Sequence, residues 1–167
     1  TNENAPAIQR IYQRLAYLWI VTIDATGIRP FKDEKNALKW KDIKRELNDD
    51  GSVKSIIVRR TEKGKRYDAL ADTHWSAIYD DIKQIHQQWE IESDYVFAHP
   101  LTIEGRKIFK NEPIKNFRSQ WRKAVEGLGF AKRFGRQQDR ISPYSLRHRY
   151  ISRRMLINKD IRIEELA

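Results

Sequence analysis

Ala25-Thr-Gly-Ile-Arg-Pro30 is the stretch that decides the fold, because it ends one regular element and prevents that element from continuing. Gly27 suits the left-handed backbone that caps a helix, and Pro30 blocks a simple continuation. Arg29 follows two residues after the glycine and is held by the backbone, so its guanidinium fork can grip two phosphate oxygens. The helix that ends here is predicted from apolar residues at helical spacing: Ile8, Ile11, Tyr12, Leu15, Leu18, Trp19 and Ile23.

Downstream of this stretch the sequence changes to a β pattern. A strand is predicted over Trp40 to Leu47, and the turn signal Asn48-Asp-Asp-Gly51 follows it. Val53 to Arg60 carries a β-branched run, and Thr61-Glu-Lys-Gly-Lys65 makes a second turn before a third strand over Arg66 to Leu70. Three short strands joined by two tight turns predict an antiparallel sheet.

The remaining regular structure is predicted to be mainly helical. Apolar periodicity indicates helices over Trp75 to Trp89 and Ile114 to Leu128. Ser142-Pro143 begins a further helix, which carries Tyr144 to about Leu156. Shorter elements are a helix over Asp33 to Leu38, an extended piece at Tyr95-Val-Phe97 and a last helix from Asp160 to Ala167. The predicted fold class is α+β, mostly helical with a small three-stranded antiparallel sheet.

Composition excludes several classes of protein. The 167 residues are enough for one domain with a real core, and 40% of them are hydrophobic. There is no cysteine, so disulfides and thiolate metal sites are excluded. No apolar run approaches the roughly 20 residues that a membrane span needs. The four histidines lack ligand spacing, so no metal site is predicted; they are His74, His86, His99 and His148.

The net charge of +10 is concentrated in the last part of the sequence. Up to Ile103 the chain holds 16 Lys and Arg against 16 Asp and Glu, whereas from Glu104 onward it holds 17 against 7. A neutral first part and a strongly basic last part favour one face that binds a polyanion. The alternative is a solvated basic surface that only aids solubility.

Two further stretches carry candidate chemistry. The turn Lys63-Gly-Lys-Arg66 can place a lysine ammonium at a hairpin tip, beside a phosphate, although an ordinary exposed turn lysine is an equal alternative. In Ser142-Pro-Tyr-Ser-Leu-Arg-His-Arg-Tyr150, Tyr144 and Arg147 lie at i and i+3 and share a helical face. Tyr150 is interpreted as a core aromatic of that helix and not as a nucleophile.

Taken together, these residues resemble the tyrosine recombinase family, also called phage integrases. That family has a Thr-Gly-Leu-Arg box, an acidic residue, a Leu-x-Trp-x-Asp-Ile segment, a catalytic lysine on a β-hairpin and a His-x-Leu-Arg-His box. The corresponding residues here are Thr26-Gly-Ile-Arg29, Glu34, Leu38-Lys-Trp-Lys-Asp-Ile43, Lys63 and Tyr144-Ser-Leu-Arg-His148. An ordered set of boxes is far more specific than a lone Thr-Gly-x-Arg.

The resemblance implies the tyrosine recombinase catalytic fold and its chemistry. A tyrosine attacks a DNA phosphate, giving a 3′-phosphotyrosine and a free 5′-hydroxyl, without metal or nucleotide cofactor. Arg29 and Arg147 would supply positive charge around the phosphate, and Lys63 would protonate the leaving oxygen. Tyr144, in the place of the usual histidine, would either assist with the proton of the nucleophile or simply orient the phosphate. Glu34 would orient Arg29 from behind. The hairpin lysine is ambiguous between Lys63 and Lys65.

The resemblance also implies partners and missing parts. The partners are double-stranded DNA and, on DNA, a tetramer of the chain itself, with no membrane and no small-molecule substrate; the expected location is the bacterial cytoplasm. The family nucleophile lies well beyond the second arginine, and the chain ends about twenty residues after Arg147. Residues 1–167 are therefore expected to be a partial catalytic domain without the N-terminal DNA-clamping domain and the C-terminal tail. Further DNA contacts are expected from Lys65, Arg66, Arg118, Arg122, Lys132, Arg133, Arg136 and His148.

Two other functions remain open on the sequence. One is a DNA-binding module without catalysis, such as a degenerate integrase-derived regulator. The other is a type IB topoisomerase, which shares the Arg, Lys, His and Tyr chemistry but relaxes supercoils alone. Each singled-out residue also has a structural reading: Arg29 as a helix cap or salt-bridge partner, and Tyr144 as packing at a helix start.

Overall fold

One long helix organises the computed structural model of the protein. The structure describes residues 6–30, 37–62, 65–72, 74–100, 102–103, 106–107, 112–114, 117–129 and 141–157. Its helices are α1 (Ala7–Thr26), α2 (Trp75–Gln88), α3 (Arg118–Gly127) and α4 (Tyr144–Ile157), and a short 3-10 helix spans Trp40–Asp42. The strands are β1 (Ile43–Leu47), β2 (Val53–Glu62), β3 (Lys65–Leu70), β4 (Thr102–Ile103) and β5 (Arg106–Lys107).

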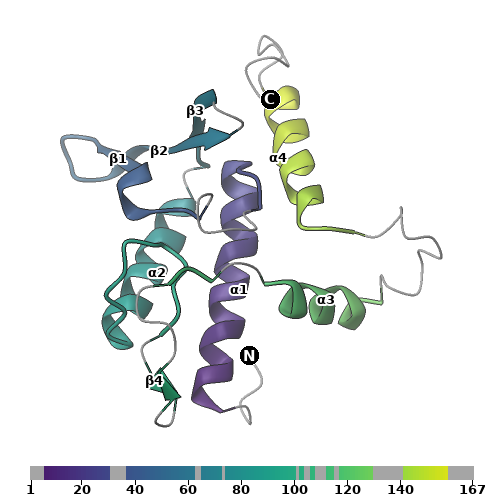
Figure 1. Ribbon diagram of the computed structural model, residues 1–167. Helices are drawn as coiled ribbons and strands as arrows, with labels where there is room; N and C mark the ends of the chain where they lie inside the picture. Colours follow the sequence, from purple (N-terminus) through teal and green to yellow (C-terminus); the bar gives the residue numbers. More distant parts are fainter. Residues whose placement is uncertain are drawn as a thin grey trace.

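Helix α1 runs through the middle of the molecule, with α2 on one side and α3 and α4 on the other (Figure 1). Its apolar stripe is buried, and Leu15, Leu18 and Ile23 have no exposed surface. Burial of each such side chain stabilises the fold by about 1.5–3 kcal/mol. The indole nitrogen of buried Trp75 donates a hydrogen bond of 2.9 Å to Thr22 Oγ1, which joins the start of α2 to α1. The sequence prediction of a central amphipathic helix is confirmed.

The three-stranded sheet is antiparallel with the order β1-β2-β3, as the sequence predicts. Ile43 pairs with Val58 across β1 and β2, and Ile57 pairs with Leu70 across β2 and β3. Side chains alternate between the faces of a strand, and Ile56 and Val58 are buried on the inner face of β2. The hairpin carrying the predicted lysines therefore has its base fixed in the core.

Two predicted boundaries were wrong. Trp40–Asp42 forms a 3-10 turn, so β1 starts only at Ile43. The helix predicted from Ile114 starts at Arg118 instead, because the Ile114 amide donates to Phe97 O at 2.8 Å and holds the chain extended there. Tertiary pairing overrides the helical spacing at this point. Most of the predicted helix over Asp33 to Leu38, and the predicted last helix, lie outside the described residues.

The join between α1 and α4 depends on a glycine. Gly27 caps α1 in the left-handed conformation, with φ 64° and its amide bonded to Ile23 O at 2.8 Å. The ring of Tyr150, on α4, lies directly against Gly27, and a Cβ built on this glycine would fall 2.2 Å from the ring. Both the backbone angle and the close approach exclude a side chain here.

In the part of the chain that the structure describes, no helix combines the length and the apolar character needed to cross a bilayer.

Gly27→Ala tests how much this close approach contributes to stability. We expect the free energy of unfolding to fall by about 3 kcal/mol or more, since the change adds a clash to the cost of a left-handed backbone. Gly51→Ala is the matched control, because Gly51 also has positive φ (80°) but nothing lies within 4 Å of its added Cβ. Urea denaturation should show a loss of only about 1–2 kcal/mol for the control. Equal losses for the two variants would contradict the packing role of Tyr150.

Candidate active site

The site is organised around the C-terminal end of α1. Arg147 on α4 is only 4% exposed, and its Nη1 donates a hydrogen bond of 2.6 Å to Gly27 O. Gly27 is the C-cap residue just beyond the last turn of α1, next to carbonyls that have no partner within the helix and carry the negative end of its dipole. Arg147 therefore caps α1 from a different helix, and this hydrogen bond restricts the orientation of the Arg147 guanidinium group.

This contact brings the two predicted arginine boxes together. Gly27 lies two residues before Arg29, so Arg147 reaches the backbone of the same box that carries Arg29. Arg29 itself is half-buried. Arg29 and Arg147 are thus at one end of α1 and not on opposite sides of the domain, although 120 residues separate Gly27 and Arg147 in sequence.

Tyr150 stands one turn beyond Arg147 and links three segments. Its ring packs on Gly27, and its hydroxyl donates a 2.6 Å hydrogen bond to Leu70 O at the end of β3. Burial raises the pKa of the Tyr150 hydroxyl, so the group stays protonated and acts as a donor. The prediction that Tyr150 is a core aromatic agrees with its 7% exposure.

A cluster of ion pairs fastens the rest of α4 to the same place. Arg153 Nη2 donates to Asp24 O at 2.6 Å, another carbonyl in the last turn of α1. Asp72 accepts from Arg153 at 3.2 Å and from Arg154 at 2.9 Å, while Arg149 lies 3.4 Å from Asp24. The Asp72 amide in turn donates to Ala25 O at 2.9 Å. The register of α4 on α1 is therefore fixed by several contacts.

Tyr144 and His148 lie on α4 nearer the surface. Tyr144 is 40% exposed, and its ring meets that of His148 edge to face, with the centroids 5.0 Å apart. Tyr144 precedes Arg147 by three residues, so it stands one helical turn from the buried guanidinium. An exposed phenol in this place is not a core-packing residue.

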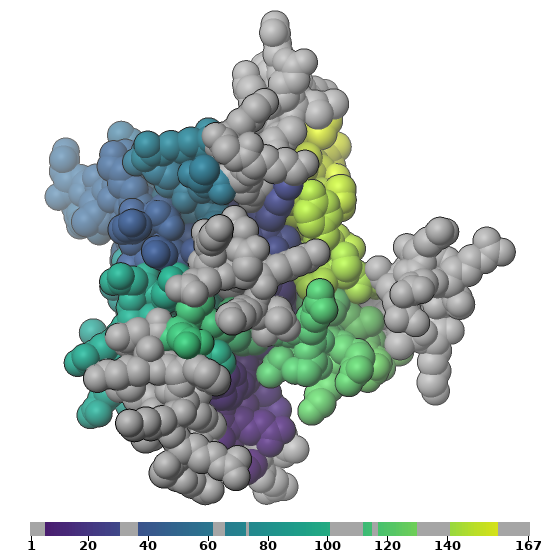
Figure 2. Space-filling view, viewed as in Figure 1, coloured from purple at the N-terminus to yellow at the C-terminus, as the bar shows by residue number. Residues whose placement is uncertain are grey.

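The predicted DNA contacts that the structure describes are exposed. Arg66 is exposed on β3, Arg118 and Arg122 are exposed on α3, and His148 is exposed on α4. Arg122 lies 3.8 Å from Glu126 on the same helix, a solvated pair of small energetic value. Helices α3 and α4 occupy the right-hand side of the molecular face in Figure 2. Several predicted site residues lie outside the described residues, or have no described side chain: Glu34, Lys63, Lys65, Lys132, Arg133 and Arg136.

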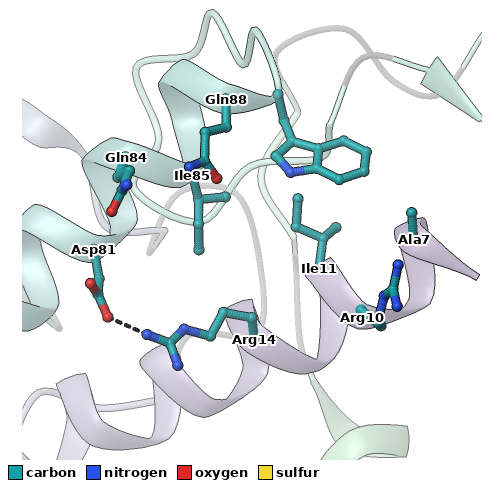
Figure 3. Close-up of a pocket in the computed structure, with 9 residues that line it drawn as sticks. Ala7, Arg10, Ile11, Arg14, Asp81, Gln84, Ile85 and Gln88 are labelled. Atoms are coloured by element: carbon teal, nitrogen blue, oxygen red, sulfur yellow. Dashed lines mark hydrogen bonds and ion pairs between the residues drawn. The ribbon is translucent and has the colours of Figure 1, made fainter. Parts of the chain in front are cut away.

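Two hollows lie along α1 and away from this site. A hollow of about 420 Å³ between α1 and α2 is lined by Arg10, Arg14, Gln88 and others. Figure 3 shows Asp81 pointing across it to pair with Arg14. A second hollow of about 490 Å³ lies between α1 and α3. Neither lining includes Arg29 or Arg147.

Within the described residues, no group of three or more His, Cys, Asp or Glu side chains could hold a metal ion. His86 is buried, and its Nε2 lies 3.0 Å from Val96 O. Burial lowers the pKa of the His86 imidazole, so this residue is a neutral core histidine.

Sequence analysis missed the residues that position the site. Arg154 follows Arg147 by seven residues and Tyr150 by four, so the three share one helical face; this spacing was the available signal. A buried arginine of the sheet was also not predicted: Arg60 is 5% exposed and continues the inner-face alternation of Ile56 and Val58 on β2.

Solved structures of site-specific recombinases resemble the fold of this chain. XerH recombinase bound to its difH substrate, in a pre-cleavage complex, aligns with a TM-score of 0.56 at 18% identity over 94% of this chain and 39% of that chain. The post-cleavage complex on palindromic difH gives 0.56 at 19% identity over 94% and 38%. The Tn1549 transposon integrase with circular intermediate DNA gives 0.49 at 16% identity over 97% and 54%. No protein-family model and no curated protein sequence matches the chain.

The chain has the fold of a tyrosine recombinase catalytic domain. The described elements include four α-helices and a three-stranded antiparallel sheet, and the match to XerH covers 94% of this chain. This confirms the fold predicted from the ordered boxes. The chain spans about two fifths of the length of the XerH structures.

Asp72→Asn tests the ion pairs that fasten α4. The change keeps the size of the side chain but removes the charge that Arg153 and Arg154 share, so we expect unfolding to become easier by about 1–2 kcal/mol at low salt. Asp68→Asn is the matched control, because the pair of Asp68 with Arg59 on the hairpin is solvated, with the two side chains 42% and 48% exposed. Its loss should stay below about 1 kcal/mol. An Asp72 effect no larger than the Asp68 effect would show that these pairs do not hold α4.

Proposed function

We propose that the chain is part of the catalytic domain of a tyrosine-type site-specific recombinase that breaks and rejoins double-stranded DNA. The observation that carries this proposal is the bond from Arg147 to Gly27 O, which brings the second arginine box to the backbone of the first. Phosphate recognition explains why two arginines so distant in sequence occur at one helix end, with an exposed phenol one turn away.

In the proposed reaction, a tyrosine oxygen attacks the phosphorus of a DNA phosphodiester. The bond from phosphorus to the 5′ oxygen breaks and the 3′ phosphate stays on the tyrosine. The tyrosine hydroxyl releases its proton to water, and the 5′ oxygen takes up a proton. Arg29 and Arg147 stabilise the negative charge that develops on the phosphoryl oxygens. The hairpin lysine, Lys63 or Lys65, supplies the proton, and Tyr144 orients the phosphate from the edge of α4. Glu34 orients Arg29.

The attacking tyrosine is proposed to lie outside residues 1–167. Tyr150 donates to Leu70 O, and Tyr12 shares a 2.7 Å hydrogen bond with His99. Burial raises the pKa of both hydroxyls, which disfavours the ionised nucleophile. In the full-length protein we propose a DNA-bound tetramer, no metal or nucleotide cofactor, and a cytoplasmic location.

One observation favours a second candidate, a DNA-binding protein without catalysis. Arg147 is 4% exposed and gives one donor to a backbone carbonyl, as a purely structural helix cap would. In that case the arginine would hold α4 against α1, and the basic surface of α3 would bind DNA by charge alone. A test of DNA cleavage distinguishes the recombinase from the DNA-binding protein without catalysis.

The decisive experiment is capture of a covalent adduct. The full-length protein is incubated with nicked duplex suicide substrates of randomised sequence, and denaturation-resistant complexes are measured. We expect an adduct, reduced about 100-fold or more by Arg147→Ala or Arg29→Ala, with DNA affinity largely kept because one phosphate contact among many is lost. The 167-residue chain alone should give none.

The possible failures of that experiment are distinct. DNA binding without any adduct from the full-length protein would support the non-catalytic candidate. A robust adduct from residues 1–167 would mean that one of the tyrosines in this chain is the nucleophile.

The basic surface of α3 gives a separate prediction about binding. Arg118→Ala and Arg122→Ala should each lower the slope of log affinity against log salt by about 0.9, if each side chain neutralises one DNA phosphate. Lys54→Ala is the control, since this exposed lysine lies on β2, in the part of the chain without net charge. Fluorescence anisotropy with a labelled duplex at several salt concentrations measures the slope. An unchanged slope for both arginine variants would remove α3 from the DNA interface.

A further inference from the structure

Tyr150, on α4, touches both of the other segments of the proposed site. Its ring covers Gly27, in the box that carries Arg29, and its hydroxyl bonds to Leu70 O at 2.6 Å. Leu70 ends β3, the second strand of the hairpin that carries Lys63 and Lys65. Arg147, on the same helix, stands one turn earlier. The three segments that hold the proposed cations therefore meet at one phenol.

The hydroxyl contact lies at the base of the hairpin, at the end of β3 that is farthest from the turn. Leu70 is paired with Ile57 across the sheet, so the Tyr150 hydroxyl holds β2 and β3 together against α4. Arg154 reaches the same carbonyl at 3.1 Å, and its guanidinium carbon lies 5.3 Å from the centre of the Tyr150 ring. Arg154 thus makes a second, longer contact to the same carbonyl, which leaves the hairpin attached when the hydroxyl is removed.

We propose that Tyr150 is a positioning residue whose hydroxyl sets where the β2–β3 hairpin, and with it the proton-donating lysine, stands relative to Arg147. This inference rests on the proposed recombinase function. The ring and the hydroxyl have separable roles: the ring fills the space over Gly27 and supports the fold, whereas the hydroxyl only fixes the hairpin. Removal of the hydroxyl should therefore impair proton donation and spare the arginines.

Tyr150→Phe removes the hydroxyl and keeps the ring. Tyr12→Phe is the matched control, because Tyr12 is a half-buried tyrosine whose hydroxyl bonds to His99 at 2.7 Å near the other end of α1. Both changes delete one tyrosine hydrogen bond, and only one of them lies at the hairpin. Thermal melting of the full-length variants establishes whether their losses of stability are similar.

The substrate can isolate the proton-donation step. In a duplex whose scissile 5′ oxygen is replaced by sulfur, the leaving group is a thiolate, which departs without protonation at neutral pH because a thiol pKa is about 8.5. In the full-length protein, Tyr150→Phe should slow single-turnover cleavage of the normal phosphodiester about tenfold or more. The same variant should cleave the sulfur substrate within about threefold of the wild-type rate, as a defect confined to proton donation predicts. Tyr12→Phe should cleave both substrates normally, and Arg147→Ala should be slow on both.

Two results would overturn the positioning role: normal cleavage by Tyr150→Phe, or equal slowing on the oxygen and sulfur substrates, which would place the defect in folding or in the arginines. Hydrogen exchange followed by mass spectrometry tests the contact without cleavage. Hairpin peptides from Arg59 to Leu70 should exchange faster in Tyr150→Phe than in Tyr12→Phe. If the wild-type protein fails to cleave but this exchange difference is seen, the proposed function fails and the structural linkage stands; without the difference, the linkage itself is refuted.

Discussion

The bond from the Arg147 guanidinium to Gly27 O is the interaction on which the rest of the site depends. A 20-residue helix ends at Thr26 with carbonyls that need donors, and no basic residue occurs in its own last turn. Two donors come from α4, where Arg147 donates to Gly27 O and Arg153 donates to Asp24 O. The backbone amide of Asp72 donates to Ala25 O. The C-terminal end of α1 thus fixes the position of helix α4 and of the chain that follows strand β3.

The same arrangement connects folding with the proposed chemistry. A guanidinium that completes a helix cap cannot rotate freely, and a pre-oriented cation stabilises developing charge without reorganising during the reaction. Gly27 has a double role, because its left-handed backbone turns the chain toward Arg29 and its missing side chain admits the Tyr150 ring.

Much of this arrangement could be predicted from sequence, and the remainder could not, for definite reasons. The helix ending at Gly27 and the hairpin strands follow from local rules, namely apolar spacing, glycine capping and turn residues. The start of α3 could not be predicted locally, because Ile114 pairs with Phe97 across the chain. Arg29 and Arg147 could be predicted as site residues because the guanidinium group of arginine is suited to binding phosphate oxygens. The roles of Arg153 and Arg154 depend on which carbonyls and carboxylates face α4, and that is a property of packing.

The central claim is that Arg29 and Arg147 hold one phosphate. A double-mutant cycle on single-turnover DNA cleavage, with Arg29→Ala, Arg147→Ala and the double variant of the full-length protein, tests this most directly. If both arginines act on one transition state, the double variant should be little slower than the slower single variant, since groups acting as a unit are strongly non-additive. Independent effects that multiply, or an Arg147→Ala variant that is less stable but cleaves normally, would contradict the account.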